Sequence, residues 1–260
     1  PALKYADIGI SMGKRGSEVS REASDLILLD DNFSTIVDTI RDGRRIYDNI
    51  RKAIGYIFII HIPIAFSSLL APLIGIKPAF LLLLPIHVVL LELVIDPTCS
   101  IVLERQPAED HIMKRKPRDK NENILTSAVL IKSIVQGIIL FIASFGVYYS
   151  HLNSFPTEHE VARSMALAVI ILSNLLLVQV NSSNIDFVYK SLKYLRNDKV
   201  MWVVSIGTLL GIIAILYTPL ANVLSLAALN LNQVIGVVII SIAAVMWYEL
   251  VKLYKKIIRN

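Results

Sequence analysis

The sequence is short of charge and of cysteine. Only 18% of its 260 residues are Asp, Glu, Lys or Arg, whereas 55% are hydrophobic, a balance too apolar for a soluble domain. The one cysteine, Cys99, excludes an internal disulfide and a thiolate metal site. The net charge of +5 comes from blocks between apolar runs and forms no basic face for nucleic acid. The composition therefore predicts a membrane-embedded protein that does not bind nucleic acid.

The sequence also lacks the features of a complete, secreted chain. It begins at Pro1 instead of a methionine. The residues that follow have neither the basic start nor the short apolar stretch of a signal peptide. We expect this chain to be part of a longer protein.

Six apolar segments are long enough to cross a bilayer, for which about 17 to 25 residues are needed. Lys and Arg crowd the flanks on one side of these segments, whereas the other side carries only Lys77 and Arg163. Because cytoplasmic flanks are enriched in Lys and Arg, both ends of the chain are expected in the cytoplasm. The predicted spans are 53–76, 79–103, 124–149, 164–183, 200–219 and 232–252.

Residues 1–31 have a different character. Residues 7–13 and 26–29 are apolar enough for two short buried strands, and residues 17–24 fit a short helix between them. Such continuously apolar strands are typical of parallel sheets that are covered on both faces. Two strands and one helix leave a sheet edge unpaired. We therefore expect an incomplete α/β layer whose other strands lie upstream of Pro1.

A long helix is predicted after this layer. From residue 32 onward, apolar residues recur at three- and four-residue spacing, and no proline interrupts the run before Pro63. Residues 32–52 are therefore expected to join the α/β part to a membrane domain at 53–260. A helix that enters the membrane without a break could transmit motion between the two.

Two carboxylates lie inside the second apolar span. Glu92 and Asp96 are four residues apart and so share one face of a helix. A carboxylate at mid-membrane costs at least about 2.5 kcal/mol on insertion scales. The pair therefore predicts a bound cation, a proton or a water-filled path. The alternative is two protonated side chains that hydrogen-bond to neighbouring helices.

Weaker signals accompany this pair. Pro63 and Pro97 each free a backbone carbonyl that a hard cation could use, and a kink made only for packing explains them equally well. His61 is expected at about the depth of Asp96, as a ligand, a proton carrier or a hydrogen-bond partner. The fourth span carries amides that either join helices or contact an ion, namely Asn174, Gln179 and Asn181.

Several stretches together resemble one protein family. Residues 1–13, PALKYADIGISMG, resemble the stretch of P-type cation-transporting ATPases that follows their GDGxND motif. Residues 44–52, RRIYDNIRK, look like the stalk helix of that family, which makes Arg44, Tyr47 and Arg51 candidate coupling residues. The resemblance extends through MKRKPR at 113–118 to the end of the chain, and it is greatest for the calcium-pump-like branch.

This resemblance implies a function for a longer chain. Residues 1–31 would be the C-terminal part of a haloacid-dehalogenase-like phosphorylation domain, and the six spans would be the fifth to tenth of ten. The intact pump would use ATP and Mg²⁺ and form an aspartyl phosphate. The remainder of the pump would supply the catalytic aspartate, the nucleotide and actuator domains and four more helices. The expected partners of this chain are therefore that remainder and the lipid bilayer. This chain alone is expected to have no catalytic residues and no ATPase activity, and the plasma membrane is its simplest location.

The resemblance also assigns ion ligands by position. Asp96 matches the acidic ligand of the sixth helix of the family, and Glu92 and His61 occupy places of asparagine ligands. Ca²⁺ or a similar divalent cation is therefore expected as the cargo. The chain departs from the calcium-pump pattern at three positions, where it carries Ile64 instead of glutamate, Ile95 instead of threonine and Pro97 instead of glycine.

Two rival functions remain. A cation- or proton-coupled secondary transporter could use the same carboxylates, although it would not explain residues 1–31. A degenerate, non-transporting membrane scaffold would follow if the changes at Ile64 and Pro97 had abolished ion movement.

Overall fold

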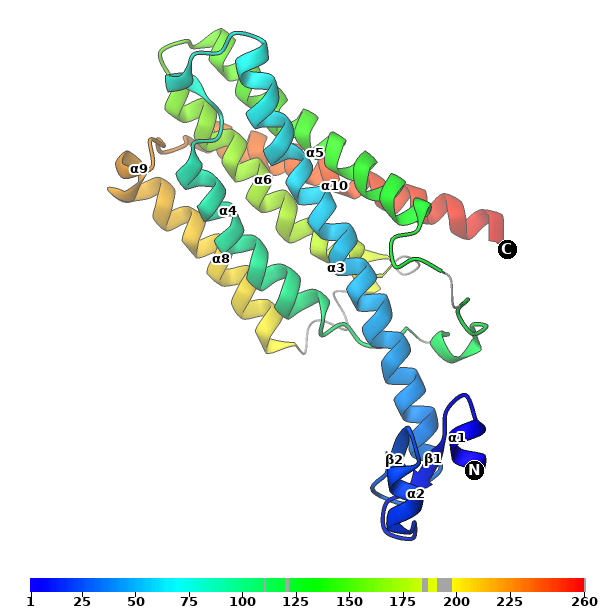
Figure 1. The fold of residues 1–260 in the computed structure, drawn as a ribbon. Coiled ribbons are helices and arrows are strands. Elements are labelled where there is room, and N and C mark those ends of the chain that lie inside the picture. The colour runs from blue at the N-terminus through cyan, green and yellow to red at the C-terminus, as the bar shows by residue number, and fades with distance from the viewer. Residues whose placement is uncertain (110, 120–121, 184–186, 191–197, 260) are drawn as a thin grey trace. The chain divides into compact units, whose positions relative to one another are not determined.

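The computed structural model describes residues 1–109, 111–119, 122–183, 187–190 and 198–259, without the side chains of Asp96, Cys99, Ser100 and Arg259. The chain is mostly helical and divides into two compact units, 1–47 with 107–116 and 48–106 with 117–260 (Figure 1). Within the described residues, six helices or helical segments are long and apolar enough to span a membrane. The predicted fold class, a mainly α bundle of six spans, is confirmed.

The first unit contains a small parallel pair of strands. The unit begins with a short helix, α1 (Ala2–Tyr5). β1 (Ile10–Met12) follows and pairs with β2 (Leu26–Leu28), and α2 (Glu18–Glu22) connects the two strands. Ser17 caps α2 by accepting a hydrogen bond from the backbone N–H of Ser20. The strands are shorter than the apolar runs suggested, and Leu29 beyond β2 is 77% exposed.

The helix α3 (Ser34–Leu73) is 40 residues long. Its start is fixed by polar side chains, because Asn32 accepts hydrogen bonds from the backbone and hydroxyl of Ser34. The helix continues through Pro63, where the sequence suggested a kink or a freed carbonyl, and through Pro72. A proline removes one backbone donor, but opening the helix in an apolar environment would leave many more polar groups unsatisfied.

The second span differs from the single helix predicted at 79–103. It begins with a 3₁₀ turn at Pro78–Phe80, becomes α4 at Pro85–Pro97 and ends in a π-helical turn at Thr98–Leu103. Pro85 suits the first turn of a helix but forces the residue before it to be extended, so α4 cannot start earlier. Pro97 has no N–H to donate, and the wider π turn follows directly.

The remaining helices lie close to the predicted spans. α5 and α10 run past the predicted ends at 149 and 252, and α6 begins before the predicted start at 164. Hydropathy marks only the apolar part of a helix, whereas backbone hydrogen bonding continues until a residue such as Pro156 stops it. The helices are α5 (Ser127–Ser154), α6 (His159–Asn181), α8 (Lys199–Tyr217), α9 (Leu220–Val223) and α10 (Leu231–Arg259).

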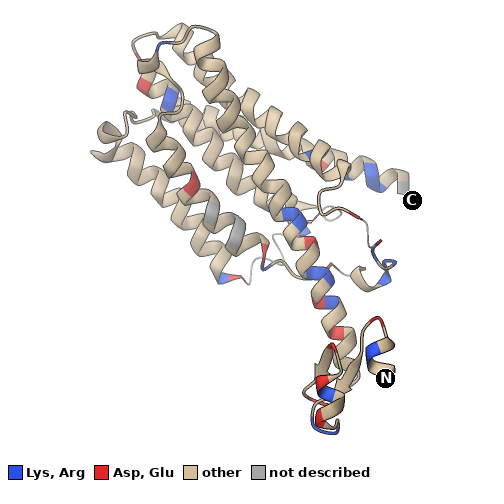
Figure 2. Cartoon of the chain, viewed as in Figure 1, with Lys and Arg blue, Asp and Glu red and all other residues tan. Residues whose placement is uncertain are grey.

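The core of the second unit is built around α6. This helix packs against both α5 and α10, and 72% of its most apolar stretch is buried, against 11% for α8 (Figure 1). Close approach of α3 and α5 depends on Gly137, where an added Cβ would lie 2.6 Å from the Cδ1 of Ile62. Lys and Arg gather mainly near helix ends and in the first unit, so the spans themselves carry few charges (Figure 2).

Candidate cation site

A histidine and a glutamate from two apolar helices meet within the second unit. The Nε2 atom of His61 in α3 lies 3.3 Å from the Oε1 atom of Glu92 in α4. The two side chains are 48% and 37% exposed, so each retains an open side. Neighbouring positions on α4 face the core, with Leu91 fully buried and Ile95 2% exposed. Glu92 therefore lies at the edge of the α4 core face, toward α3.

The ring of His61 is oriented by its own helix. Its Nδ1 atom lies 2.8 Å from the carbonyl oxygen of Ile57, one turn earlier in α3. Because a carbonyl oxygen can only accept, Nδ1 carries a hydrogen and donates it. The other ring nitrogen, Nε2, is thereby directed at Glu92.

Asp96 follows Glu92 by one helical turn in α4, but its side chain lies outside the described residues. The backbone here leaves regular α geometry immediately afterwards, because α4 ends at Pro97 and the π-helical turn begins at Thr98. The hydroxyl of Thr98 donates to the carbonyl of Val94 at 2.7 Å. Single π turns inside helices are frequent at functional sites.

The start of α4 is held by a buried arginine. Arg163 of α6 is 1% exposed and donates hydrogen bonds to the carbonyls of Ala79, Leu81 and Ser225 at 3.0, 2.9 and 2.7 Å. The first two carbonyls belong to the segment that leads into α4. From the sequence, Arg163 was used only as a charge that indicates topology. Its position at the edge of an apolar span was the signal that could have suggested a buried structural role.

A buried histidine supports the same end of α4. His87 is fully buried, accepts a hydrogen bond at Nδ1 from the backbone N–H of Leu84 and donates from Nε2 to the carbonyl of Leu224. The hydroxyl of Tyr148 also donates to the carbonyl of Phe80 in this region. The N-terminal end of α4 is therefore fixed by side chains of α4, α5 and α6.

The far end of this span is tied to α3. Asn49 is 2% exposed, and its Nδ2 atom donates to the carbonyls of Glu104 and Gln106 at 3.0 and 2.8 Å. These carbonyls follow the π-helical turn directly. Sequence reasoning missed Asn49, although an asparagine at a core position of an amphipathic helix was visible.

The amides predicted on the fourth span do not join the carboxylate–imidazole pair. Asn174 and Asn181 are buried in α6, and within the described residues their amide groups have no hydrogen-bond partner. Gln179 donates to the sulfur of Met201 in α8 at 3.3 Å. Asn174 and Asn181 are therefore buried polar groups of α6, and Ser173 of the same helix is likewise buried without a partner in the described part of the chain.

Comparison with known proteins shows which family the chain belongs to. The family model for the C-terminus of cation-transporting ATPases matches residues 80–254. The chain belongs to this family. Calcium-transporting ATPase 1 of Bacillus cereus is 33% identical over 98% of the chain. A calcium-transporting ATPase of Plasmodium falciparum is 31% identical over 98% of the chain. Sodium/potassium-transporting ATPase subunit alpha-3 of Gallus gallus is 42% identical over 58% of it.

These relatives are much longer than the chain, which spans 30%, 24% and 15% of their respective lengths. Together with the six apolar spans, the family places this cation-transporting ATPase portion in a membrane as an integral protein. The expected resemblance to P-type cation-transporting ATPases is confirmed.

The candidate coupling residues make defined contacts within their own units. In the first unit, Arg44 donates from Nη1 to the carbonyls of Ile112 and Arg115 at 2.8 and 3.0 Å, and Tyr47 is half-buried. In the second unit, Arg51 lies 3.5 Å from Glu122 and donates to the hydroxyl of Thr126.

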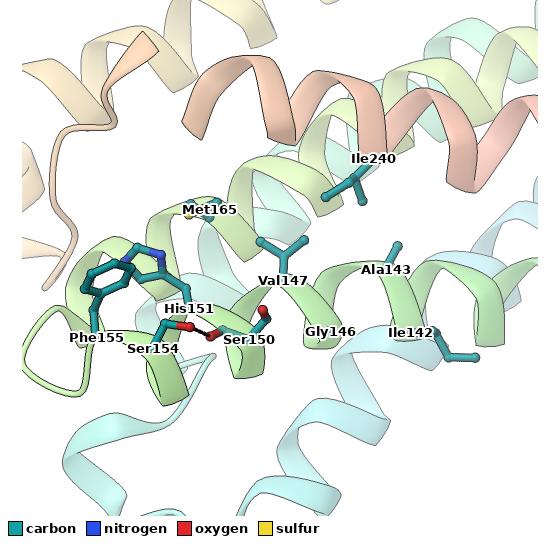
Figure 3. Close-up of a pocket in the computed structure, with 10 residues that line it drawn as sticks. All are labelled: Ile142, Ala143, Gly146, Val147, Ser150, His151, Ser154, Phe155, Met165 and Ile240. Atoms are coloured by element: carbon teal, nitrogen blue, oxygen red, sulfur yellow. Dashed lines mark hydrogen bonds between the residues drawn. The ribbon is translucent and has the colours of Figure 1, made fainter. Parts of the chain in front are cut away.

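The chain also carries an open groove at one end of α5. Its volume is about 550 Å³, and its lining comes from α5, α6 and α10 with Phe155 at one end (Figure 3). The polar groups include Ser154, whose hydroxyl donates to the carbonyl of Ser150 at 3.0 Å, and the ring of His151. None of the predicted cation ligands lines this groove.

Proposed function

We propose that this chain is the membrane and coupling portion of an ATP-driven P-type cation pump that carries Ca²⁺ or a similar divalent cation. The observation that supports the proposal best is the approach of Glu92 to His61 between two apolar helices. A carboxylate in such a place is costly without a cation or proton. The names of the relatives, several of them calcium-transporting ATPases, support the same class of cargo.

In this proposal Glu92 and Asp96 supply the negative charge that binds the cargo, and His61 supplies a nitrogen ligand. The π turn after Pro97 would let the inner part of the span change its register while α4 itself stays helical. Arg163 and Asn49 would hold the two ends of the span between them. The site can then open toward one face without loss of the core.

The coupling part is proposed to begin in the first 52 residues. Residues 1–31, with their parallel strands, would complete a phosphorylation domain, and residues 32–52 of α3 would transmit its movements. ATP, Mg²⁺ and the phosphorylated aspartate would belong to the rest of the pump, so this chain alone would not hydrolyse ATP. Both ends would face the cytoplasm, in accord with the Lys and Arg flanks, and the plasma membrane is the proposed location.

Cation-stimulated ATP hydrolysis by the full-length protein tests this function. Glu92→Gln and Asp96→Asn should each raise the cation concentration for half-maximal activity by about tenfold or more, because each removes one charge from the site. Glu104→Gln, an exposed glutamate of the same segment, is the matched control and should leave that concentration unchanged. Unchanged cation dependence in both site variants would contradict the ligand assignment.

Transport in vesicles separates the pump from a secondary carrier. The full-length protein should accumulate cation only when ATP is supplied, whereas a carrier would respond to an ion gradient without ATP. A protein that neither hydrolyses ATP nor moves cations would be the degenerate scaffold.

A further inference from the structure

We infer that the carried cation is a borderline transition-metal ion such as Zn²⁺ and not Ca²⁺, an inference that rests on the proposed pump function. Three features of the His61–Glu92 pair carry it: the orientation of the ring, the spacing of the two facing atoms and the chemistry of an imidazole ligand.

The first feature is the tautomer of His61. Its Nδ1 hydrogen is committed to the carbonyl of Ile57, so the neutral ring presents a lone pair at Nε2. Histidines that bind metals in proteins usually donate their other ring N–H to a carbonyl or carboxylate in this way, because the bond fixes the tautomer and the ring angle. The hydrogen bond at Nδ1 thus fixes the ring orientation that a metal-binding histidine needs, with Nε2 directed at Glu92 and able to bind a metal ion when it carries no hydrogen.

The second feature is distance. Nε2 of His61 and Oε1 of Glu92 are 3.3 Å apart. Two ligand atoms at metal distances of about 2.0 to 2.1 Å on adjacent corners of a tetrahedron are separated by about 3.3 to 3.4 Å. The pair therefore already spans one edge of a tetrahedral site without movement of either helix.

The third feature is ligand chemistry. Ca²⁺ and Mg²⁺ are bound almost entirely by oxygen, whereas imidazole nitrogen suits Zn²⁺ and the neighbouring transition metals. An imidazole in the site takes the place of one oxygen ligand and so weakens the binding of Ca²⁺ relative to that of Zn²⁺. The preference follows from one residue, because asparagine at position 61 would supply an oxygen instead.

The pair is only part of a metal site. Within the described residues no group of three His, Cys, Asp or Glu side chains is assembled. The half-exposed faces of both side chains leave room for further ligands such as water. The inference therefore concerns the selectivity that these two atoms impose.

The test compares Zn²⁺ and Ca²⁺ on the purified full-length pump in the presence of ATP and Mg²⁺. Wild-type protein should reach half-maximal ATPase activity at a lower free Zn²⁺ than Ca²⁺ concentration. His61→Asn should weaken activation by Zn²⁺ by at least about tenfold and leave activation by Ca²⁺ equal or stronger. A wild-type preference for Ca²⁺, or an unchanged Zn²⁺/Ca²⁺ ratio in His61→Asn, would overturn the inference.

A matched control is available in the same chain. His151 forms a similar pair with Glu158, with Nε2 and Oε2 3.1 Å apart, but it lies at the end of α5 and not in the site. His151→Asn should leave the Zn²⁺/Ca²⁺ ratio unchanged. A shift as large as that of His61→Asn would show that a histidine elsewhere controls the ratio and would overturn the inference.

Binding measured without turnover gives an independent readout. Co²⁺ added to wild-type protein should produce the visible absorption of a nitrogen-ligated tetrahedral ion, and His61→Asn should lose it while His151→Asn keeps it. If His61→Asn does not fold, the inference is tested by the wild-type protein alone, through the free Zn²⁺ and Ca²⁺ concentrations that give half-maximal ATPase activity. If neither cation stimulates ATP hydrolysis by the wild type, the proposed pump function fails. If Ca²⁺ acts at the lower concentration, the pump stands and only this inference is lost.

Discussion

Arg163 donates from its Nε atom to the carbonyl oxygen of Leu81, which lies 82 residues earlier in the chain, at 2.9 Å. Two further carbonyls, of Ala79 and Ser225, accept from the other nitrogens of the same guanidinium. One buried cation thus joins α6 to the segment that leads into α4 and to the loop before α10. The planar, forked guanidinium is suited to this role because it offers donors in several directions.

Arg163→Lys should therefore destabilise the protein strongly. A lysine ammonium keeps the charge but cannot reach all three carbonyls, and each buried carbonyl left without a donor costs about 1 to 3 kcal/mol. We expect a loss of about 2 to 4 kcal/mol, measured as a lower thermal unfolding midpoint in detergent. Arg105→Lys changes an exposed arginine in the same way and serves as the control. Equal midpoints for the two variants would contradict the role of Arg163.

Gly137→Ala tests the close approach of α3 and α5. The added methyl would lie 2.6 Å from Ile62 Cδ1 and 3.0 Å from the carbonyl oxygen of Ile59, so the helices must separate. Overpacking of this kind typically costs about 1 to 3 kcal/mol. Gly146→Ala in the same helix meets nothing within 4 Å and should be neutral or slightly stabilising. Thermal unfolding of the two variants side by side measures the difference, and equal midpoints would mean that the contact is easily relaxed.

The start of α3 should depend on pH through Asp30. The hydroxyl of Thr35 and the backbone N–H of Asn32 donate to its carboxylate and hold the pKa below the ordinary value of 3.8. Because the folded state binds this proton more weakly than the unfolded state, the stabilisation is fully present above pH 3.8 and is lost as the pH falls through the lower folded pKa. Asp30 is exposed, so the effect should be local.

Hydrogen exchange of the backbone amides at residues 34–37, corrected for the intrinsic rate, measures this effect. Protection should fall on acidification in the wild type, and Asp30→Asn should lower protection at neutral pH and flatten the dependence. Asp38→Asn replaces an exposed aspartate of the same helix and should keep the wild-type profile. A profile for Asp30→Asn that matches the wild type would refute this account of the helix start.

Much of the bundle could be predicted from apolar length because transfer free energies add along a segment whatever its neighbours are. The ends of the helices were less predictable, as α5 shows by continuing to Ser154 past its apolar part. The interruption of the second span was also missed. Its two prolines were visible, but whether a helix bends, stops or changes to a π turn depends on which partners its freed groups find.

The sequence alone places Glu92 and Asp96 on one face of a helix, because helix periodicity is a local property. It also predicts that an acid inside an apolar span needs a compensating charge, because the cost of burying a carboxylate depends mainly on its depth. Only the folded bundle brought His61 to Glu92 across 31 residues of sequence and turned its Nε2 atom toward the carboxylate. Only in the folded bundle do Arg163 and Asn49 reach the backbone carbonyls at the two ends of the span that contains α4. Contacts between helices depend on how their faces pack against one another, and that geometry exists only when all of them are in place.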